Sequence, residues 1–313
     1  MRKQTLGWIL ILVLSNAWLG FLVWRSDSES SGRFSMKYPL LSKRLAVEDQ
    51  NDFLLDFEPL RQEIKSYLNK IPIDHSFYFE YLPSGVSVRG HGDEKFRGAS
   101  LMKIPLVVDL FRRAEEGHVD LDAPVVVTEQ QINDAGGFGN VTHLRPGDRI
   151  TLREAARLVL TLSDNTAAAV LMDRMGTIVQ EGSVLNMLDL PITKESGNGG
   201  ILISAMSYAS IFKCLYLSCF LSPASSQEIL EELSRSANRD RLVAGIPGDV
   251  KAANKIGAFN EEVQSDCAIV YEPNRPYLIC LMLSTPDSVE VAKHFKTVSK
   301  MTYSYVHGIK RNF

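Results

Sequence analysis

Three short motifs that combine serine, lysine and asparagine side chains occur in a fixed order along the chain. The first has the form Ser-x-x-Lys and spans Ser100–Lys103, the second is Ser-Asp-Asn at Ser163–Asn165, and the third is Lys-Ile-Gly at Lys255–Gly257. A serine hydroxyl is a weak nucleophile that needs a base, and a lysine can be that base when burial or a nearby positive charge lowers its pKa. The residue types therefore indicate acyl-transfer chemistry through a serine.

Each side chain in these motifs has a candidate role. Ser100 is expected at the start of a helix, with Lys103 one turn later on the same face, so that the lysine amine can reach the serine oxygen. Lys255 could supply a second positive charge, and Ser163 could relay a proton between the nucleophile and the leaving group. Asn165 offers an amide that can hold an amide of the substrate, and the backbone N–H at the helix start can donate to a developing oxyanion.

Each motif also has a purely structural interpretation. Ser-x-x-Lys occurs by chance in many proteins, Ser163–Asn165 could simply cap a helix, and Lys255 could be a surface lysine at a strand end. The fixed order of the motifs, and the position of each at the start or end of an expected element, favour the catalytic interpretation.

The elements expected around the motifs are a few strands, many helices, a strand hairpin and a last helix. The apolar run Ile104–Phe111 predicts a buried helix, in which Pro105 leaves the carbonyl of Leu101 without its usual partner. Thr151–Glu154 fits a capping box for a helix that ends at the second motif. Further helices are expected at 58–69, after the second motif to 172, from 204, at 222–233 and at 291–305, and strands at 77–82, 86–88, from the third motif, 267–271 and 277–283. This order predicts an α+β fold with an antiparallel sheet.

The amino-terminal segment 6–24 carries no charge and is long enough to cross a bilayer as a helix. Arg2 and Lys3 precede it and favour a cytoplasmic start, which predicts a single-pass protein of the cell membrane with its catalytic domain outside the cytoplasm. A cleaved signal peptide, with a small-x-small site at Ser15–Ala17, is the alternative, and a buried core helix is a third. The expected organisation is an anchor or signal peptide at 1–25, a linker at 26–57 and a serine hydrolase domain at 58–313.

The charge and the motif content of the chain give no indication of nucleic-acid, metal or cofactor binding. The net charge of -3, without a basic stripe, gives no footprint for nucleic acid, and no metal-ligand spacing or glycine-rich phosphate loop occurs, so no cofactor is expected. The four cysteines sit in apolar surroundings and are interpreted as buried hydrophobic residues. Cys267 and Cys280 could face each other across a hairpin, although spacing does not fix the pairing of Cys214, Cys219 and these two.

The chain from residue 71 to 313 resembles the penicillin-recognising serine hydrolases, specifically the class A β-lactamases and their relatives. The resemblance is carried by Gly-Ala-Ser-Leu-Met-Lys at 98–103, by 149–154 followed by Leu-Ser-Asp-Asn-Thr-Ala at 162–167, and by 241–257. It implies an antiparallel sheet packed with helices beside a mostly helical lobe, with the site between them.

The resemblance also implies roles for single residues. Ser100 would be the acylated nucleophile and Lys103 its base, while Ser163 would shuttle a proton. In the substrate-binding part of the site, Asn165 would bind the side-chain amide of the substrate. Lys255 would support the Ser163 region, and Gly257 and Ala258 complete this strand, where the amide of Ala258 would form the oxyanion hole with that of Ser100.

Two positions depart from the family pattern. Ile256 replaces a threonine or serine whose hydroxyl helps to bind the substrate carboxylate, and losing such a bond to a charged group costs about 1.5–3 kcal/mol. The family also carries a glutamate in a Glu-x-x-x-Asn pattern on an Ω-loop, which activates the deacylating water. Here the short stretch 191–198 offers only Glu195-Ser196-Gly197-Asn198, so that Glu195 is a candidate base and a glycine-rich surface loop is the alternative.

Three functions are compatible with this sequence. The first is a membrane-anchored, class A β-lactamase-like serine hydrolase that acts on a β-lactam or a related amide. The second is a penicillin-binding-protein-like D,D-peptidase or esterase that acts on a peptidoglycan-type substrate. The third is a non-enzymatic module that binds the cell wall, against which the five intact polar residues of the three motifs argue.

Overall fold

The computed structural model describes residue 40 and residues 56–135, 144–176, 182–195, 200–259, 262–286 and 289–309. The expected anchor at 6–24 lies outside these ranges. Within them, no helix combines the length and the apolar character that a membrane crossing needs.

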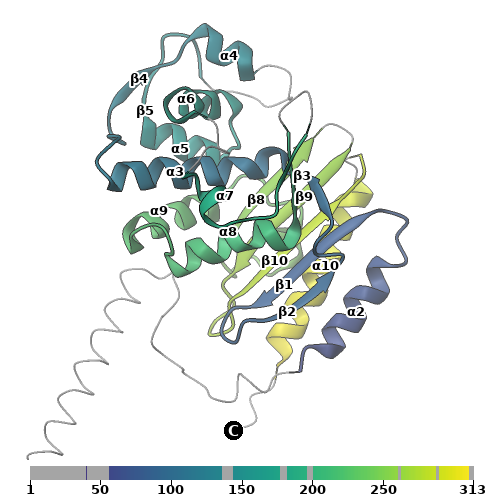
Figure 1. Ribbon diagram of the computed structural model, residues 1–313. Helices are drawn as coiled ribbons and strands as arrows, with labels where there is room; N and C mark the ends of the chain where they lie inside the picture. The colour runs from purple at the N-terminus through teal and green to yellow at the C-terminus, as the bar shows by residue number, and fades with distance from the viewer. Residues whose placement is uncertain are drawn as a thin grey trace, which may run out of the picture.

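A five-stranded antiparallel sheet forms the centre of the fold (Figure 1). Its strands are ordered β2-β1-β10-β9-β8, so that β8, which contains the third motif, lies at one edge. The bounds are β1 His75–Tyr81, β2 Val86–Gly90, β8 Ala252–Phe259, β9 Val263–Val270 and β10 Tyr277–Leu283. The predicted α+β class with an antiparallel sheet is confirmed.

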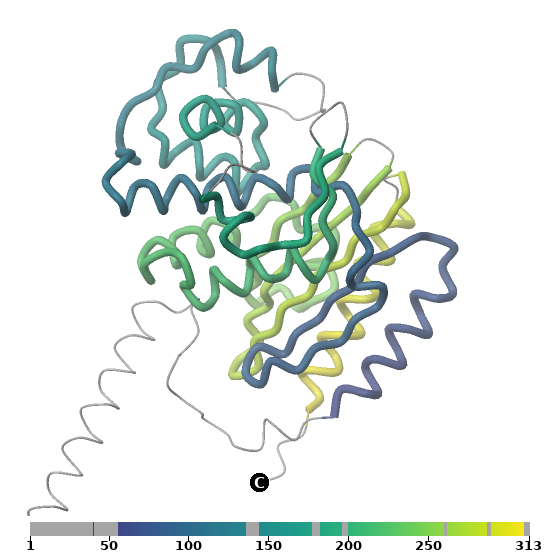
Figure 2. The backbone as a smooth tube through the Cα atoms, viewed as in Figure 1, coloured from purple at the N-terminus to yellow at the C-terminus, as the bar shows by residue number. Residues whose placement is uncertain are grey.

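Helices cover both faces of this sheet, and a helical lobe lies beside it (Figures 1 and 2). On one face α2 and α10 bury residues such as Leu60 and Phe295 against Phe79. On the other face α8 and the lobe pack against the sheet through residues such as Phe212. The helices are α2 Glu58–Leu68, α3 Lys103–Glu115, α4 Glu129–Ala135, α5 Leu152–Thr161, α6 Asn165–Met175, α7 Val184–Met187, α8 Ala205–Leu217, α9 Pro223–Ser234 and α10 Val289–Gly308.

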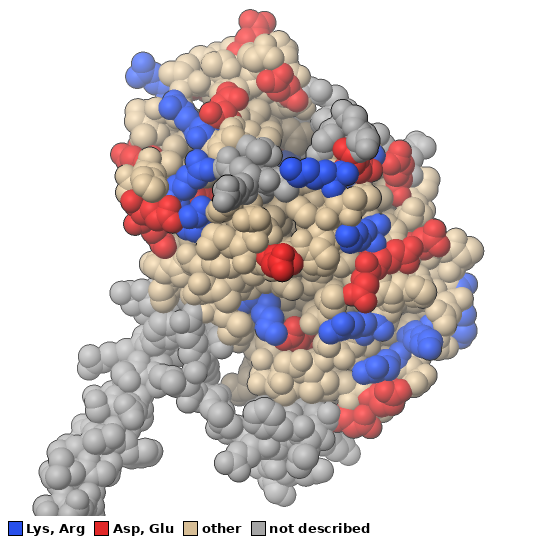
Figure 3. Space-filling model, viewed as in Figure 1, with Lys and Arg blue, Asp and Glu red and all other residues tan. Residues whose placement is uncertain are grey.

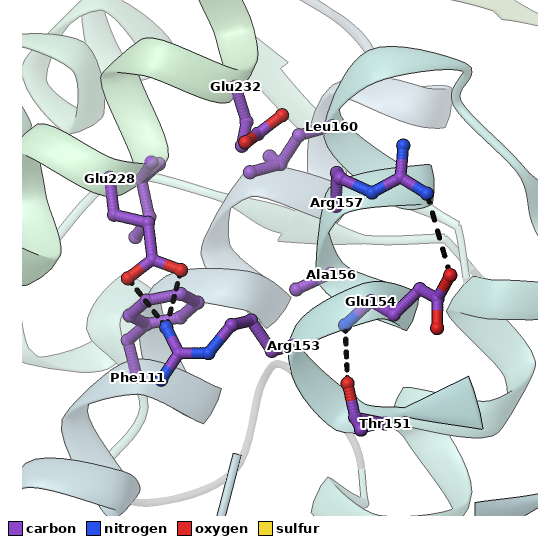
Figure 4. A pocket seen from close by; sticks show the side chains of 10 residues that line it. Phe111, Thr151, Arg153, Glu154, Ala156, Arg157, Leu160, Glu228 and Glu232 are labelled. Carbon is purple, nitrogen blue, oxygen red and sulfur yellow. Dashed lines mark hydrogen bonds and ion pairs between the residues drawn. The ribbon is translucent and has the colours of Figure 1, made fainter. Parts of the chain in front are cut away.

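Helix starts follow the sequence signals closely. Thr151 caps α5 by accepting a hydrogen bond from the amide of Glu154 at 3.1 Å, and Ser204 and Ser222 cap α8 and α9 in the same way. Between α5 and α9 lies a hollow of about 230 Å³, across which Arg153 donates to Glu228 at 2.5 Å (Figure 4). No residue of the three motifs lines this hollow.

The short strands were not expected from the sequence. A small sheet consists of three strands in the order β3 Lys95–Arg97, β7 Ile201–Ser204 and β6 Thr193–Lys194. A separate pair consists of β4 Pro124–Val126 and β5 Arg149–Thr151. Two to four residues are too few for an alternating pattern to be recognised. β3 matters for the site, because it leads directly into the first motif.

The predicted strand at 267–271 begins too late, since β9 starts at Val263. The residues that were missed include Gln264 and Asp266, which are polar and nevertheless fully buried. Gln264 accepts a hydrogen bond from Arg241, and Asp266 accepts one from Asn254, so neither side chain needs water as a partner. A search for apolar residues in the sequence could not indicate these bonds.

Cys267 and Cys280 are directly opposed in the register of β9 and β10 and are joined by a disulfide. Both side chains are fully buried, on the sheet face that packs against the helical lobe. The hairpin pairing that the sequence left open is therefore formed. The other two cysteines, Cys214 and Cys219, are free thiols.

The first motif lies in a 3-10 turn, Ala99–Met102, that precedes α3. Pro105 has no N–H to donate to Leu101, as the sequence predicts. The carbonyl of Leu101 accepts instead from the hydroxyl of Tyr208 at 2.8 Å, a buried bond between α8 and the turn. Tyr208 thus stabilises the backbone immediately after Ser100.

We expect Tyr208→Phe to lower the free energy of unfolding by about 1–2 kcal/mol, because it removes the buried hydrogen bond from the Tyr208 hydroxyl to the Leu101 carbonyl. Urea denaturation followed by circular dichroism measures this difference. Tyr303→Phe, which removes an α10 hydroxyl whose long hydrogen bond to His307 is exposed to solvent, is the matched control and should change stability by less than about 0.5 kcal/mol. Equal stability of Tyr208→Phe and wild type would show that the bond to Leu101 does not support the turn.

Candidate active site

The fold brings the three motifs together at the boundary between the sheet and the helical lobe. Ser100 lies in the 3-10 turn before α3, Ser163 in the turn between α5 and α6, and Lys255 on the edge strand β8. Hydrogen bonds link Ser163 to both lysines, so residues that are far apart in sequence meet around one hydroxyl.

The amine of Lys103 bonds to the second motif. It donates to the carbonyl oxygen of Ser163 at 2.5 Å and to Oδ1 of Asn165 at 2.5 Å, and it lies 3.3 Å from Oγ of Ser163. Burial lowers the pKa of Lys103 to about 8, although the negative charge of Asp164 opposes this shift. A neutral lysine has two N–H donors and one lone pair, so the two short bonds leave the lone pair available to accept a proton.

Lys255 lies on the other side of the same hydroxyl. Its amine donates to Oγ of Ser163 at 2.7 Å and to the carbonyl of Ile256 at 3.1 Å, and only 1% of the residue is exposed. Burial lowers the pKa of Lys255 well below its ordinary value, and the positive charges of Lys103 and Arg241 lower it further. The positive charge of Lys103 thus disfavours the charged form of Lys255.

The side chain of Ser100 is half-buried, and within the described part of the chain its hydroxyl makes no hydrogen bond. The bond from Lys103 to Ser100 that the spacing predicts is therefore not formed. The amine of Lys103 has two closer acceptors on the second motif, and the 3-10 turn places Ser100 differently from an α-helical turn. A proton transfer from Ser100 to Lys103 requires a small movement of one side chain.

Two non-glycine residues at the site adopt left-handed backbone conformations. Ala99, directly before Ser100, has φ 45°, and Ser163 has φ 58°. Such conformations cost roughly 1–3 kcal/mol each and persist where the surroundings hold them, often at functional sites. Here one lies directly before the first motif and the other begins the second motif.

Gly257 explains why the third motif ends in glycine. A Cβ atom at this position would lie 2.8 Å from Cγ of Leu101 and 3.1 Å from the carbonyl oxygen of Gly98. Any side chain would therefore push β8 away from the turn that carries Ser100. Ala258 follows at the exposed edge of the strand, and the oxyanion hole formed by its amide and that of Ser100 stays a prediction.

A buried polar network behind β8 was not assigned a role by sequence reasoning. Arg241 donates to the carbonyl oxygens of Gly257 at 3.0 Å and Ser265 at 2.8 Å, which ties β8 to β9 beside the third motif. Asp266 accepts from the amide of Leu242 at 2.9 Å, and burial raises the pKa of Asp266 to about 7. No spacing rule marks such a network, because its members pair through the fold and not through a local repeat.

Glu195 is held by Arg97 of β3. The guanidinium donates from Nη2 to Oε1 at 2.9 Å, and its Nε lies 2.8 Å from Oε2, so both carboxylate oxygens face the same cation. Arg97 also stacks over the ring of Phe259 at the end of β8, 3.9 Å from the ring centroid. Glu195 thus ties its loop to β3, and this arrangement does not present a free carboxylate to a water molecule.

The described residues contain no group of three or more His, Cys, Asp or Glu side chains that could hold a metal ion. Acidic and basic side chains are interspersed on the face shown in Figure 3.

The sequence matches the model of the beta-lactamase enzyme family over residues 59–306. Among curated relatives, beta-lactamase 3 of Bacillus cereus is 24% identical, over 74% of this chain and 73% of the relative. Beta-lactamase 1 of Streptomyces cacaoi is 26% identical, over 54% of this chain and 57% of the relative.

The fold of this chain is similar to those of solved structures of PBP-A and of a beta-lactamase. PBP-A superposes with a TM-score of 0.72 and 26% identity, over 80% of this chain and 97% of PBP-A. A mutant of PBP-A, solved as an acyl-enzyme complex with penicillin G, gives 0.73 with the same identity and coverage. A beta-lactamase from Sphaerobacter thermophilus gives 0.72 with 20% identity, over 82% of this chain and all of the other.

Proposed function

The chain belongs to the beta-lactamase enzyme family, and from that premise we propose that it is a serine hydrolase whose Ser100 is acylated by a β-lactam or a related amide. The observation that carries the proposal is the pair of lysines, half-buried Lys103 and buried Lys255, on the hydroxyl of Ser163. This arrangement supports proton transfer at a serine nucleophile.

In the proposed acylation step, Oγ of Ser100 attacks the carbonyl carbon of the substrate amide while neutral Lys103 accepts the serine proton. The carbonyl oxygen becomes an oxyanion, to which the amides of Ser100 and Ala258 are suited to donate. Asn165 holds the side-chain amide of the substrate through its own amide group. The buried, low-pKa state of Lys103 supports this role, because only the neutral amine can accept a proton.

Collapse of the intermediate breaks the carbon–nitrogen bond and needs a proton on the leaving nitrogen. Ser163 is suited to supply it, because its hydroxyl lies between Lys103 and Lys255 and can be reprotonated by either amine. The products of this step are an ester on Ser100 and an amine. Hydrolysis of that ester by water then regenerates the serine.

Release of the acyl group is proposed to be slow. The observation in favour is the ion pair of Glu195 with Arg97, which leaves no carboxylate of this loop free to activate water. The likeness to PBP-A, a mutant of which was captured as an acyl-enzyme with penicillin G, fits the same behaviour. A penicillin-binding-protein-like D,D-peptidase or esterase acting on peptidoglycan is therefore the second candidate function.

A time course with a fluorescent penicillin tests the proposal. The full chain should acquire one covalent label, which persists for many minutes after excess unlabelled penicillin is added. Rapid appearance and loss of the label would instead indicate efficient β-lactam hydrolysis. Absence of label with every β-lactam and ester probe would contradict the enzymatic proposal and leave a wall-binding module as the alternative.

We expect Glu195→Gln to change the rate of label release by less than about threefold, whereas loss of a true general base costs about 10²–10⁴-fold. The reason is that Arg97 already binds both carboxylate oxygens. Single-turnover decay of the labelled enzyme measures the rate. Arg97→Ala is the companion variant, and a decay that became faster in it but not in Glu195→Gln would show that the freed carboxylate can act as a base.

Ile256→Thr should raise the second-order rate constant of penicillin acylation by about 10–100-fold, which corresponds to a regained hydrogen bond of about 1.5–3 kcal/mol to the substrate carboxylate. Ile256 lies on the edge strand and is partly exposed, so a hydroxyl there can reach solvent and a bound ligand. Ile256→Val is the matched control, since it shortens the side chain without adding a donor. An unchanged rate in Ile256→Thr would show that substrate charge is recognised elsewhere.

The proposal extends to location. The uncharged segment 6–24 supports a single-pass anchor in the cell membrane, with the hydrolase domain outside the cytoplasm, where a peptidoglycan-type substrate is available. Fractionation of cells that express the full chain, followed by protease treatment of intact spheroplasts, tests it. A hydrolase domain that stays protected, or that appears in the soluble fraction, would contradict the anchor.

A further inference from the structure

The carboxyl end of α8 carries two cysteines that the proposed chemistry does not use. Ser218 follows the helix in a left-handed conformation, with φ 50° and ψ 52°. The amide of Ser218 donates to the carbonyl of Leu215 at 3.1 Å, and the amide of Cys219 donates to the carbonyl of Cys214 at 3.0 Å. These two bonds around a left-handed residue form a Schellman motif.

A Schellman motif brings two particular side chains together. The first belongs to the residue directly after the left-handed residue, and the second belongs to the residue five positions earlier in the chain. These two side chains usually make an apolar contact. Here these positions hold Cys219 and Cys214. The Cys219 side chain is close enough to raise the pKa of the Cys214 thiol, as expected for two residues at these positions of the motif.

The two thiols differ in their access to solvent. Cys219 is exposed, whereas Cys214 is 6% exposed and borders a small cavity lined by residues such as Val108 and Phe220. A reagent from solvent therefore meets Cys219 first, and Cys214 lies behind it as the only other free thiol of the described residues.

We propose that Cys214 and Cys219 are a redox-active dithiol that closes to a disulfide on reaction with a small-molecule disulfide such as oxidised glutathione. In the first step the Cys219 thiolate attacks one sulfur of oxidised glutathione, which forms a mixed disulfide and releases one glutathione thiolate. In the second step the Cys214 thiolate attacks Sγ of Cys219 and releases the second glutathione. Two protein thiols are oxidised and one glutathione disulfide is reduced to two thiols.

The second step should be the slower one. Burial, together with the hydrogen bond to Cys219, raises the pKa of the Cys214 thiol, so its thiolate is scarce at neutral pH. The rate of closure should therefore rise with pH, and the mixed disulfide on Cys219 should be seen transiently.

Peptide mapping of the full chain tests the proposal directly. The chain is incubated with oxidised glutathione, quenched in acid, unfolded, alkylated with N-ethylmaleimide and digested with trypsin. Both cysteines fall in one tryptic peptide, because Lys213 and Arg235 are consecutive cleavage sites. Cys267 and Cys280 fall together in a different peptide and serve as the internal reference.

The expected result is a peptide 214–235 that takes up no maleimide and weighs two hydrogen atoms less than the reduced form, a change that a reductant reverses. Two outcomes would overturn the proposal. One is a peptide that keeps two maleimide groups. The other is a glutathione adduct on Cys219 that persists beside an alkylated Cys214 even after prolonged incubation at about pH 9, where the Cys214 thiolate is more abundant than at neutral pH.

Two variants separate the steps. Cys214→Ser should retain glutathione on Cys219 as a stable mixed disulfide, because the resolving thiol is missing. Cys219→Ser should block oxidation of Cys214, because the exposed thiol that starts the reaction is missing. Glutathione on Cys214 in the second variant, or spontaneous loss of glutathione in the first, would contradict this order of attack.

Discussion

Ser100→Ala is expected to abolish covalent labelling by penicillin, with a loss of at least about 10⁴-fold in acylation rate, because no other group replaces a missing nucleophile. Ser100 is half-buried and its hydroxyl makes no hydrogen bond in the described chain, so the stability should change by less than about 1 kcal/mol. Gel fluorescence after incubation with the labelled penicillin measures the first effect, and thermal unfolding measures the second.

The matched control is Ser304→Ala, which removes an exposed serine of α10 and should label at the wild-type rate. Tryptic mapping of the labelled wild type should place the adduct on the peptide that contains Ser100. Labelling of Ser100→Ala at more than a few per cent of the wild-type rate, or an adduct on another peptide, would remove Ser100 from the proposed role. A thermal unfolding curve equal to that of the wild type would show that loss of labelling in Ser100→Ala does not come from unfolding.

Local signals in the sequence predicted the elements that hold the site. A threonine three residues before a glutamate predicted the cap of α5, and Pro105 predicted that the carbonyl of Leu101 lacks its usual helical partner. Such predictions succeed because caps and prolines act on backbone groups within one helical turn. The partner of Leu101, Tyr208, could not be predicted, since it comes from another helix more than a hundred residues away.

The buried polar residues of β9 could not be predicted from the sequence for a related reason. Asp266 and Gln264 interrupt the apolar pattern of β9, so the strand was predicted to begin at Cys267. Their burial is stabilised by Arg241 and Asn254, whose hydrogen bonds exist only once β8 and β9 pair. The sequence therefore identified the residues of the three motifs but not the network that holds the third motif in place.

The short loop at Glu195 shows the limit of a motif taken alone. Its spacing left two interpretations, a deacylation base and a surface loop, and β3, which supplies Arg97, was itself too short to predict. The ion pair joins this loop to the strand that leads into the nucleophile turn. Glu195, a candidate base by its sequence position, thus has a structural role: it holds its loop against β3.

The pH dependence of acylation provides the sharpest test of Lys103. Burial lowers the pKa of Lys103 to about 8, so the amine is protonated and inactive as a base below that pH, and it is neutral and active above it. The acylation rate should therefore fall about tenfold for each pH unit below 8 and level off above it. Stopped-flow acylation with a chromogenic β-lactam measures the profile.

Three variants distinguish a base from a positive charge. Lys103→Met removes both properties and Lys103→Arg keeps only the charge, so both should lose about 10²–10⁴-fold in acylation rate if Lys103 acts as the base. Retention of activity in Lys103→Arg would show that a cation alone suffices. Asp164→Asn keeps the cap of α6 but removes the negative charge that raises the pKa of Lys103, so its midpoint should move to lower pH. A midpoint that stays at the wild-type pH in this variant would mean that the profile reports a group other than Lys103.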